Sequence, residues 1–144
     1  MKVLNRKARF NYQILEKFEA GIVLLGAEIK SIRAGRMSLN ESFVKIRDGE
    51  SWLVNAYINP WTGAKVDSQR SRKLLLKKAE IRNLFGKVSQ KGLAVIPLAC
   101  YIKNNVAKVE IALAKSKKSF EKRDEIKSRD LMREIERELR GKSE

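Results

Sequence analysis

The segment from residue 12 to residue 25 alternates between apolar and polar residues, and no other feature constrains the fold as strongly. The apolar residues of this segment share one side, interrupted only at Glu16, and they are Tyr12, Ile14, Phe18, Ala20, Ile22 and Leu24. A period of two is typical of a strand with one buried face. Gly21 and Gly26 would let this strand bend, as strands do at the corner of a barrel. The sequence therefore predicts a long, half-buried and curved strand.

Two dipeptides predict tight hairpins further along the chain. The apolar-rich runs that flank them are 42–47 and 52–58 around Asp48-Gly49, and 93–103 and 106–114 around Asn104-Asn105. Residues of these types accept the positive φ that a two-residue turn requires. Pro97 has no N–H to donate to a sheet, so we expect an edge position or a bulge there.

Apolar spacing predicts two helices, and a basic loop precedes the second of them. Ile29 and Ile32 favour a short helix over 27–34, with Gly35 placed to cap its end. The second helix is expected over 74–90, where apolar residues recur at helical spacing, namely Ile81, Leu84, Phe85 and Val88. Residues 59–72 lack periodicity and are expected to form a mobile loop.

The predicted order of elements is strand, helix, hairpin, helix, hairpin. Short antiparallel strands with few helices are typical of a small barrel, and we expect five or six strands of the oligonucleotide-binding type. This mainly β domain with short helices is expected to span residues 1–114. Residues 115–144 are expected to form a basic C-terminal tail whose apolar stripe is too thin to stabilise a helix by packing. We expect that tail to be disordered alone and helical on a partner.

The balance of charge favours a polyanionic partner. The chain carries 32 Lys and Arg against 17 Asp and Glu, a formal net charge of +15. A field of one sign attracts nucleic acid, the commonest polyanion of the cytoplasm. The alternative is a solvated, highly charged surface such as heat-adapted proteins have, although those surfaces mix the two signs more evenly. Most of the excess lies in residues 1–114, so the predicted barrel is itself basic.

The sequence also indicates a compartment. Cys100 is the one cysteine, so no intramolecular disulfide can form, which fits a reducing environment. Residues 1–10 are basic and lack the apolar centre of a secretory signal. No run approaches the roughly 20 apolar residues that span a membrane. We expect a cytoplasmic protein with no membrane contact.

Residues that support catalysis are scarce. There is no histidine, and one cysteine cannot build a zinc site. Cys100 lies in an apolar run and is expected to be a buried, inert thiol. No phosphate-binding glycine loop is present, and nothing marks Glu19 and Glu28 as a catalytic pair. We expect no enzyme activity, no catalytic residue, no metal and no cofactor.

Several basic groups are candidate RNA contacts, each with a simpler alternative as solvated charge. Asn5-Arg6-Lys7-Ala8-Arg9 is interpreted as a basic N-terminal arm. Arg33 and Arg36 are one helical turn apart and could share a face. Arg70-Ser71-Arg72-Lys73 is expected where a loop meets a helix N-terminus, which itself attracts phosphate.

Two further residues have more than one interpretation. Glu19 either orders an arginine in a salt bridge, or accepts a hydrogen bond from an RNA base or orients the arginines that contact RNA. Phe120 lies between Lys117-Lys118 and Lys122-Arg123. It either stacks on an unpaired base or anchors the tail on the barrel.

At these residues the chain resembles small protein B, the SsrA-binding protein family of bacterial trans-translation. The matching stretches run from Asn5 to about Asp130, and the longest are Gly26-Ala27-Glu28-Ile29-Lys30-Ser31-Ile32-Arg33-Ala34-Gly35 and Arg70-Ser71-Arg72-Lys73-Leu74-Leu75-Leu76. The shorter ones are Asn5-Arg6-Lys7-Ala8, Phe18-Glu19-Ala20-Gly21-Ile22, Ala107-Lys108-Val109-Glu110-Ile111-Ala112-Leu113-Ala114, Lys117-Lys118 and Lys122-Arg123.

The resemblance implies an oligonucleotide-binding-type barrel that holds the tRNA-like domain of transfer-messenger RNA (tmRNA) and delivers it to stalled ribosomes. It implies that the tail enters the empty mRNA channel beside the decoding site and folds as a helix. Through tmRNA, it also implies elongation factor Tu and alanyl-tRNA synthetase as partners. By motif match, Asn5, Glu19 and Leu75 fall on tmRNA-contacting positions and Phe120 on the stacking position of the tail.

The predicted sites are therefore two sets. The RNA-binding set is Asn5, Arg6, Lys7, Glu19, Arg33, Arg36, Arg70, Arg72, Lys73, Leu75 and Lys108. The ribosome-binding set is Lys117, Lys118, Phe120, Lys122, Arg123, Lys127 and Arg129. The chain departs from the family pattern at Ser116, Phe120 and Glu121, and in the short loop before Arg70. The competing hypotheses are a ribosomal protein or general RNA chaperone, and a membrane-surface protein that uses the tail as an amphipathic helix.

Overall fold

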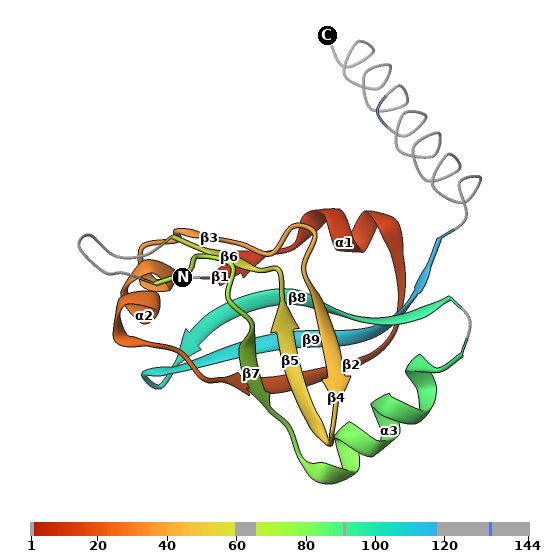
Figure 1. The fold of residues 1–144 in the computed structure, drawn as a ribbon. Helices are drawn as coiled ribbons and strands as arrows, with labels where there is room; N and C mark the ends of the chain where they lie inside the picture. The colour runs from red at the N-terminus through yellow and green to blue at the C-terminus, as the bar shows by residue number, and fades with distance from the viewer. Residues whose placement is uncertain (1, 60–65, 91, 118–132, 134–144) are drawn as a thin grey trace, which may run out of the picture.

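The computed structural model describes residues 2–59, 66–90, 92–117 and 133. Its strands are β1 (Lys2–Leu4), β2 (Tyr12–Ile22), β3 (Met37–Ser38), β4 (Phe43–Arg47), β5 (Glu50–Val54), β6 (Tyr57–Ile58), β7 (Arg72–Leu75), β8 (Leu93–Lys103) and β9 (Val106–Ser116). Its helices are α1 (Arg6–Asn11), α2 (Gly26–Arg33) and α3 (Lys78–Val88). The main sheet is antiparallel with the order β1-β8-β4-β5-β7-β2-β9, and a further pairing of β8 with β9 closes it (Figure 1).

Six strands of this sheet form a closed barrel, and β1 pairs with the second half of β8, on the edge whose first half pairs with β4. This confirms a small antiparallel barrel with short helices. Both predicted two-residue turns are present, because Asp48, Gly49, Asn104 and Asn105 all adopt positive φ. The Pro97 irregularity is also present, as a register shift between β8 and β9 at Pro97/Ala99.

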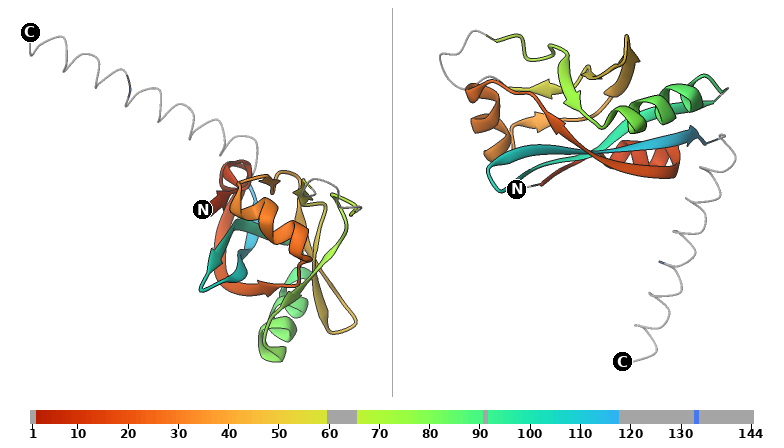
Figure 2. Two further views of the ribbon diagram at one scale, coloured as in Figure 1. Left: turned by 90° about the vertical axis from the view of Figure 1, so that its left-hand side faces the viewer. Right: turned by 90° about the horizontal axis from the view of Figure 1, so that it is seen from below.

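The helices cover the barrel on three sides. α2 lies across one end of the barrel, near the β8–β9 turn, and α3 lies where β8 begins (Figures 1 and 2). Ile32 of α2 and Leu84 of α3 are both fully buried in the main core inside the barrel. α1 packs on the outer surface, where Ala8 joins a second, smaller core. No described helix is long and apolar enough to cross a lipid bilayer.

A bulge in β2 changes the interpretation of its apolar face. The register of β2 against β9 shifts between Ile14 and Glu16. Tyr12 and Ile14 therefore pack outside the barrel beneath α1, whereas Phe18, Ala20 and Ile22 belong to the core inside it. The expectation of a single apolar face was wrong because one extra residue in a strand reverses the side on which the following residues lie.

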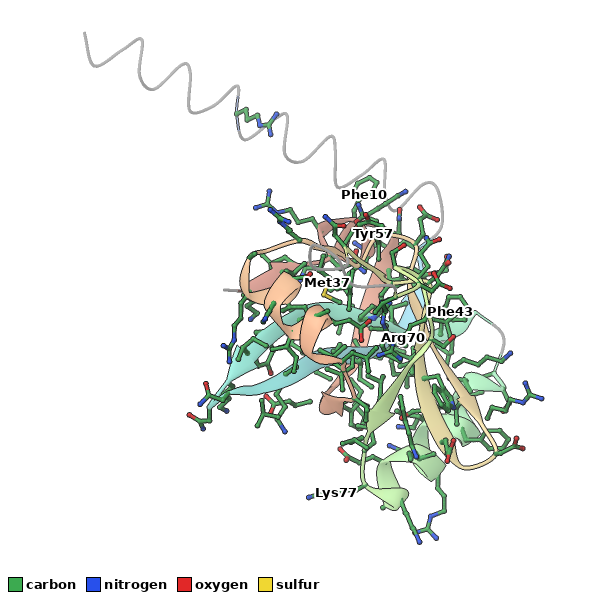
Figure 3. The ribbon with its side chains drawn as sticks, turned by 60° about the vertical axis from the view of Figure 1, so that its left-hand side comes forward. Phe10, Met37, Phe43, Tyr57, Arg70 and Lys77 are labelled. Atoms are coloured by element: carbon green, nitrogen blue, oxygen red, sulfur yellow. The ribbon has the colours of Figure 1, made fainter. Side chains whose placement is uncertain are left out.

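Residues 72–75 form a strand, contrary to the prediction that a helix begins at residue 74. The three leucines at 74–76 are compatible with either period. β7 pairs with both β5 and β2, and without it both of those strands would present an unpaired edge. The helix starts at Lys78, and Arg70-Ser71-Arg72-Lys73 therefore leads into a strand. Figure 3 shows Arg70 well away from Lys77, which precedes α3.

Three further expectations need correction. The N-terminal segment, interpreted as a basic arm, forms β1 and α1 and packs on the barrel. The run at 52–58 is two strands, because Asn55 has φ 70° and turns the chain, so that β6 pairs with β3 in a separate ribbon. β9 continues through Ser116, past the predicted end of the strand at residue 114.

Candidate nucleic-acid interface

The outer face of β9 and its neighbours is divided into a covered half and an open half. Ala112 and Ala114 of β9 point outward and are buried beneath α1. Glu110 and Lys108 continue the same face, because residues two apart on a strand lie on one side. Both are half-buried, and neither belongs to the core beneath α1. The open half is therefore the part of the sheet that another molecule can reach.

The strand register places one row of residues across five strands of this open half. Lys2 on β1 pairs with Tyr101 on β8, Tyr101 with Lys108 on β9, Lys108 with Gly21 on β2, and Gly21 with Leu75 on β7. Directly paired residues of antiparallel strands project from the same face. At about 4.8 Å between strands, the row extends roughly 19 Å along the surface. We call Lys2, Glu19, Gly21, Leu75, Tyr101 and Lys108 the platform.

Glu19 and Tyr101 form the polar centre of the platform. The Tyr101 hydroxyl donates a hydrogen bond to Glu19 Oε2, and the Lys2 ammonium lies 5.5 Å from the centre of the Tyr101 ring. This hydrogen bond, aided by the positive charges of Lys103 and Lys108, lowers the pKa of Glu19 below 4.5. Partial burial, together with the neighbouring Glu19 charge, raises the pKa of Tyr101 to about 12. At neutral pH Glu19 is thus an ionised acceptor whose partner in the structure is a tyrosine, and not an arginine as one of the two interpretations of the sequence required.

Gly21 and Leu75 form the apolar end of the platform. A Cβ at Gly21 would lie 3.3 Å from Leu75 Cβ, tighter than ordinary van der Waals contact. Leu75 is 55% exposed even though it is a large apolar residue. Val23, two residues beyond Gly21, is also exposed. Gly21 itself is buried against the Leu75 side chain, so the apolar surface at this end is supplied by Leu75 and Val23.

The platform has the chemistry that a folded nucleic acid requires. Ammonium groups at Lys2 and Lys108 can neutralise phosphates. The apolar end can contact sugars or bases, and an ionised carboxylate can accept hydrogen bonds from base amino groups or from 2′-hydroxyls. Among the predicted RNA-binding residues, the structure brings together Glu19, Leu75 and Lys108.

Arg72 does not belong to this surface, although it stands in the predicted RNA-binding set. Its side chain is 0% exposed, and Glu28, its partner, is 1% exposed. Arg72 Nε and Nη2 donate to Glu28 Oε2 at 2.9 and 2.7 Å, and the remaining donors reach Ala56 O and Ser68 O at 2.6 and 3.0 Å. Arg72 therefore holds α2, β7 and the segments on either side of β6 together. It has no free face for a phosphate.

Arg70 is the outer member of the same cluster. Its guanidinium also donates to Glu28, at Oε1, and its side chain is 30% exposed. Arg70 Nε is buried without a hydrogen-bond partner among the described residues. Glu28 Oε1 additionally accepts the Leu25 N–H at 3.0 Å. One buried carboxylate thus positions two arginines, and only Arg70 keeps access to the surface.

This cluster predicts a specific dependence of stability on pH. Burial alone would raise the pKa of Glu28, but hydrogen bonds from Arg70, the Leu25 N–H and Arg72 outweigh it, so the pKa lies below 4.5. A lowered pKa stabilises the folded state above the unfolded-state value, and this stabilisation is lost as the pH falls through the folded-state value. In denaturant titrations, the stability advantage of the wild type over Glu28→Gln should therefore shrink below about pH 4.5. An advantage that is constant from pH 7 to pH 3 would contradict this account.

The N-terminal residues of the predicted set have structural partners. Asn5 is buried, accepts the Ala8 N–H as the N-cap of α1, and donates to Leu39 O and Pro97 O at 3.2 and 2.9 Å. Asn5 thus fixes α1 to β8 and is not placed to contact RNA directly. Lys7 forms an exposed ion pair with Glu41. Arg6 is exposed at the start of α1.

The remaining basic residues of the set are dispersed. Arg33 ends α2, and its Nη2 lies 3.5 Å from Asn105 Oδ1 at the β8–β9 turn, near one end of the platform. Arg36 follows the left-handed Gly35, so Arg33 and Arg36 do not share a helical face as expected. Lys73 bonds Glu50 at 3.2 Å. Lys117 lies 3.5 Å from Arg9 O. The other six residues of the ribosome-binding set lie outside the described residues, and they are Lys118, Phe120, Lys122, Arg123, Lys127 and Arg129.

Sequence reasoning missed three members of the platform, namely Lys2, Gly21 and Tyr101. The pair of Tyr101 and Lys108 could have been found, because a two-residue turn at Asn104-Asn105 pairs Lys103 with Val106 and then every residue outward from it. Lys2 could not, since nothing in three residues at the N-terminus identifies β8 as their partner.

Two observations bear on catalysis and metals. Cys100 is fully buried, and burial raises the pKa of its thiol to about 12. The prediction of a buried thiol is confirmed, and at neutral pH the thiol is protonated. Within 2–59, 66–90 and 92–117, no cluster of histidine, cysteine or carboxylate side chains is arranged to hold a metal ion.

Known proteins are similar to this chain in sequence and in fold. The family model described as SmpB protein matches residues 2–141. The SsrA-binding protein of Sulfurihydrogenibium sp. is 55% identical over 141 residues, covering 96% of this chain and 93% of that protein. The SsrA-binding protein of Carboxydothermus hydrogenoformans is 51% identical, with 96% and 95% covered.

A solved structure gives the same result. A chain of the structure described as "tmRNA-SmpB: a journey to the center of the bacterial ribosome" superposes with a TM-score of 0.71 at 49% identity, covering 82% of this chain and 85% of that one. Identity near one half over nearly the full length, together with the shared barrel, leaves one assignment: this chain belongs to the SmpB protein family.

Proposed function

We propose that this chain binds the tRNA-like domain of tmRNA on the platform and delivers it to stalled ribosomes for trans-translation. The observation that carries the proposal is the row of lysine, tyrosine, glycine and leucine, with Lys2 and Leu75 exposed at its two ends, on the half of the outer face that α1 leaves open. Relatives about half identical over the whole chain are named SsrA-binding proteins, which supports the same RNA as the ligand.

The protein acts by binding and not by catalysis. The platform offers charge, exposed apolar surface and one ionised acceptor, and it contains neither a nucleophile nor a general base poised near neutral pH. The body, residues 1–114, holds the RNA, and the tail, residues 115–144, makes the contact with the mRNA channel. The site of action is the cytoplasm. Elongation factor Tu and alanyl-tRNA synthetase stay predictions as partners that act through tmRNA.

Selective retention of RNA tests this proposal. The full chain should retain tmRNA in preference to bulk tRNA and ribosomal RNA at moderate salt, because a shaped platform with few charges discriminates better than diffuse charge does. Equal retention of all three would favour a general RNA chaperone or a ribosomal protein.

Lys108→Ala should weaken tmRNA binding and reduce the slope of log K against log salt by about 1, the effect of losing one phosphate contact. Lys108 lies in the middle of the platform row, between Tyr101 and Gly21. Lys45→Ala is the matched control, because Lys45 is an exposed lysine on β4, a strand that contributes no residue to that row. Filter binding over a range of salt concentrations measures both slopes. Identical slopes for the two variants would remove Lys108 from the interface.

A further inference from the structure

Glu110, next to the platform, is a carboxylate that the fold does not explain. Among the described residues, every other Asp or Glu side chain forms a hydrogen bond or an ion pair. Glu110 forms neither with any described residue, although its side chain is half-buried on the outer face of β9. A half-buried acceptor without a donor loses part of its hydration and gains no hydrogen bond in return. The reason for its position therefore lies outside the folded chain.

The strand register places Glu110 directly opposite a second carboxylate. Glu110 on β9 pairs with Glu19 on β2, and these two strands lie side by side along most of their length (Figure 1). The Cβ atoms of such a pair are about 4.5–5.5 Å apart, and like charges placed directly opposite each other destabilise a sheet. The fold thus contains an unfavourable contact on the part of the outer face that another molecule can reach.

Positive charge lies on one side of this carboxylate pair. Lys108 precedes Glu110 by two residues on the same face, roughly 7 Å along β9. Lys103, whose charge acts on Glu19, lies further on, at the end of β8. A bound RNA would place its phosphates at the lysines, because the two carboxylates repel them. The groups of RNA left to face the carboxylates are those that donate hydrogen bonds, which are base amino groups and ribose 2′-hydroxyls.

We propose that Glu110 is a specificity-determining residue: it accepts a hydrogen bond from such a donor on tmRNA and, with Glu19, keeps phosphates away from the centre of the platform. This inference rests on the proposed function. It divides the surface by chemistry, so that the lysines bind the RNA backbone and the carboxylate pair fixes which part of the RNA lies beside them. A residue with the wrong charge for a polyanion then favours the correct RNA.

Removal of this carboxylate has opposite effects under the two explanations. If Glu110 only adds negative charge, Glu110→Leu should bind every RNA more tightly. If Glu110 accepts a hydrogen bond from tmRNA, the variant should bind tmRNA roughly 10- to 100-fold more weakly, the effect of losing one hydrogen bond to a charged group. It should bind duplex DNA of equal length at least as tightly as the wild type does, because the phosphates dominate that binding. Filter binding with the full chain measures both affinities.

Two comparisons separate this role from a loss of structure. Glu41→Gln removes the same charge from the exposed turn between β3 and β4, which contributes no residue to the platform, and should not weaken tmRNA binding. Glu110→Leu should be at least as stable as the wild type, because the repulsion from Glu19 is relieved, and urea titration checks this. A clearly less stable variant would assign Glu110 to the fold and overturn the inference.

Nucleotide-analogue interference distinguishes the two sources of the donor. The tRNA-like domain is transcribed with sparse 2′-deoxy nucleotides, or with base analogues that lack an exocyclic amino group, and the bound and unbound RNAs are sequenced. Positions at which 2′-deoxy substitution weakens binding to the wild type but not to Glu110→Leu would assign the donor to a ribose. Positions at which the base analogues behave in this way would assign it to a base. If the two proteins showed the same pattern at every position, no donor would contact Glu110.

Failure of this inference and failure of the proposed function give different results. Tighter binding of tmRNA by Glu110→Leu would overturn the role of Glu110 alone, provided that the wild type still prefers tmRNA to bulk tRNA. A wild type without that preference would refute the platform, and the role of Glu110 with it, whatever the variant does.

Discussion

Arg72→Ala should lower the free energy of unfolding by about 3–5 kcal/mol, the effect of removing one partner from a buried ion pair. Glu28 would remain buried with only Arg70 to neutralise it, and Ala56 O and Ser68 O would lose their donor. A small domain has a total stability of about 5–15 kcal/mol, so the variant should be close to unfolding at physiological temperature. Urea titration followed by circular dichroism measures the loss.

Arg72→Lys separates this structural role from a phosphate contact. Lysine keeps the positive charge but cannot reproduce four hydrogen bonds from a planar guanidinium. If Arg72 met RNA at the surface, the lysine variant would be stable and would keep most of its affinity. We expect it instead to be nearly as unstable as the alanine variant. A stable Arg72→Lys protein would refute the buried role.

Lys73→Ala is the control at the neighbouring position. The Lys73 side chain is 42% exposed and that of its partner Glu50 is 45% exposed, so the pair contributes about 0–1 kcal/mol. This variant should remain folded. Any change that it causes in the salt dependence of RNA binding would then report an RNA contact and not a loss of structure. A variant that replaced both Arg72 and Lys73 could not distinguish these two causes.

The difference between Arg72 and its neighbours shows what the sequence could and could not predict. The sequence alone predicts that the basic run at 70–73 is a loop leading into a helix, and in that setting every guanidinium would be exposed. Had residues 72–75 been recognised as a strand, alternation would have placed Arg72 on the inner side with Leu74, and Lys73 and Leu75 outside. The error in secondary structure therefore placed Arg72 at the surface, whereas the structure buries it.

The features predicted correctly depend on local chemistry. Positive φ at Asp48-Gly49 and Asn104-Asn105 requires particular residue types, and so the hairpins could be recognised from dipeptides. The bulge in β2 and the pairing of β1 with β8 depend on contacts between residues far apart in sequence. The platform is built from those distant pairings, which explains why only Glu19, Leu75 and Lys108 of its six residues were predicted, two of them on the strength of a family resemblance.

Removal of residues 118–144 should leave tmRNA affinity essentially unchanged and abolish ribosome rescue. The Lys117 N–H donates to Asn11 O at 2.9 Å and β9 ends at Ser116, so truncation after Lys117 retains every strand of the barrel. The platform lies toward the other end of β9, at Lys108. Filter binding with tmRNA and a peptide-tagging assay on ribosomes that carry a truncated message measure the two activities separately.

Weaker tmRNA binding after truncation would mean that the tail belongs to the main RNA site.

Within the tail, Phe120→Tyr and Phe120→Leu form a matched pair. Phe120 lies between Lys117-Lys118 and Lys122-Arg123, so its neighbours can hold phosphates while its ring stacks on a base. We expect Phe120→Tyr to rescue ribosomes as the wild type does, and Phe120→Leu to be defective with normal tmRNA affinity. Equal activity of the two variants would show that the side chain at position 120 acts as an apolar anchor, because leucine preserves burial but cannot stack.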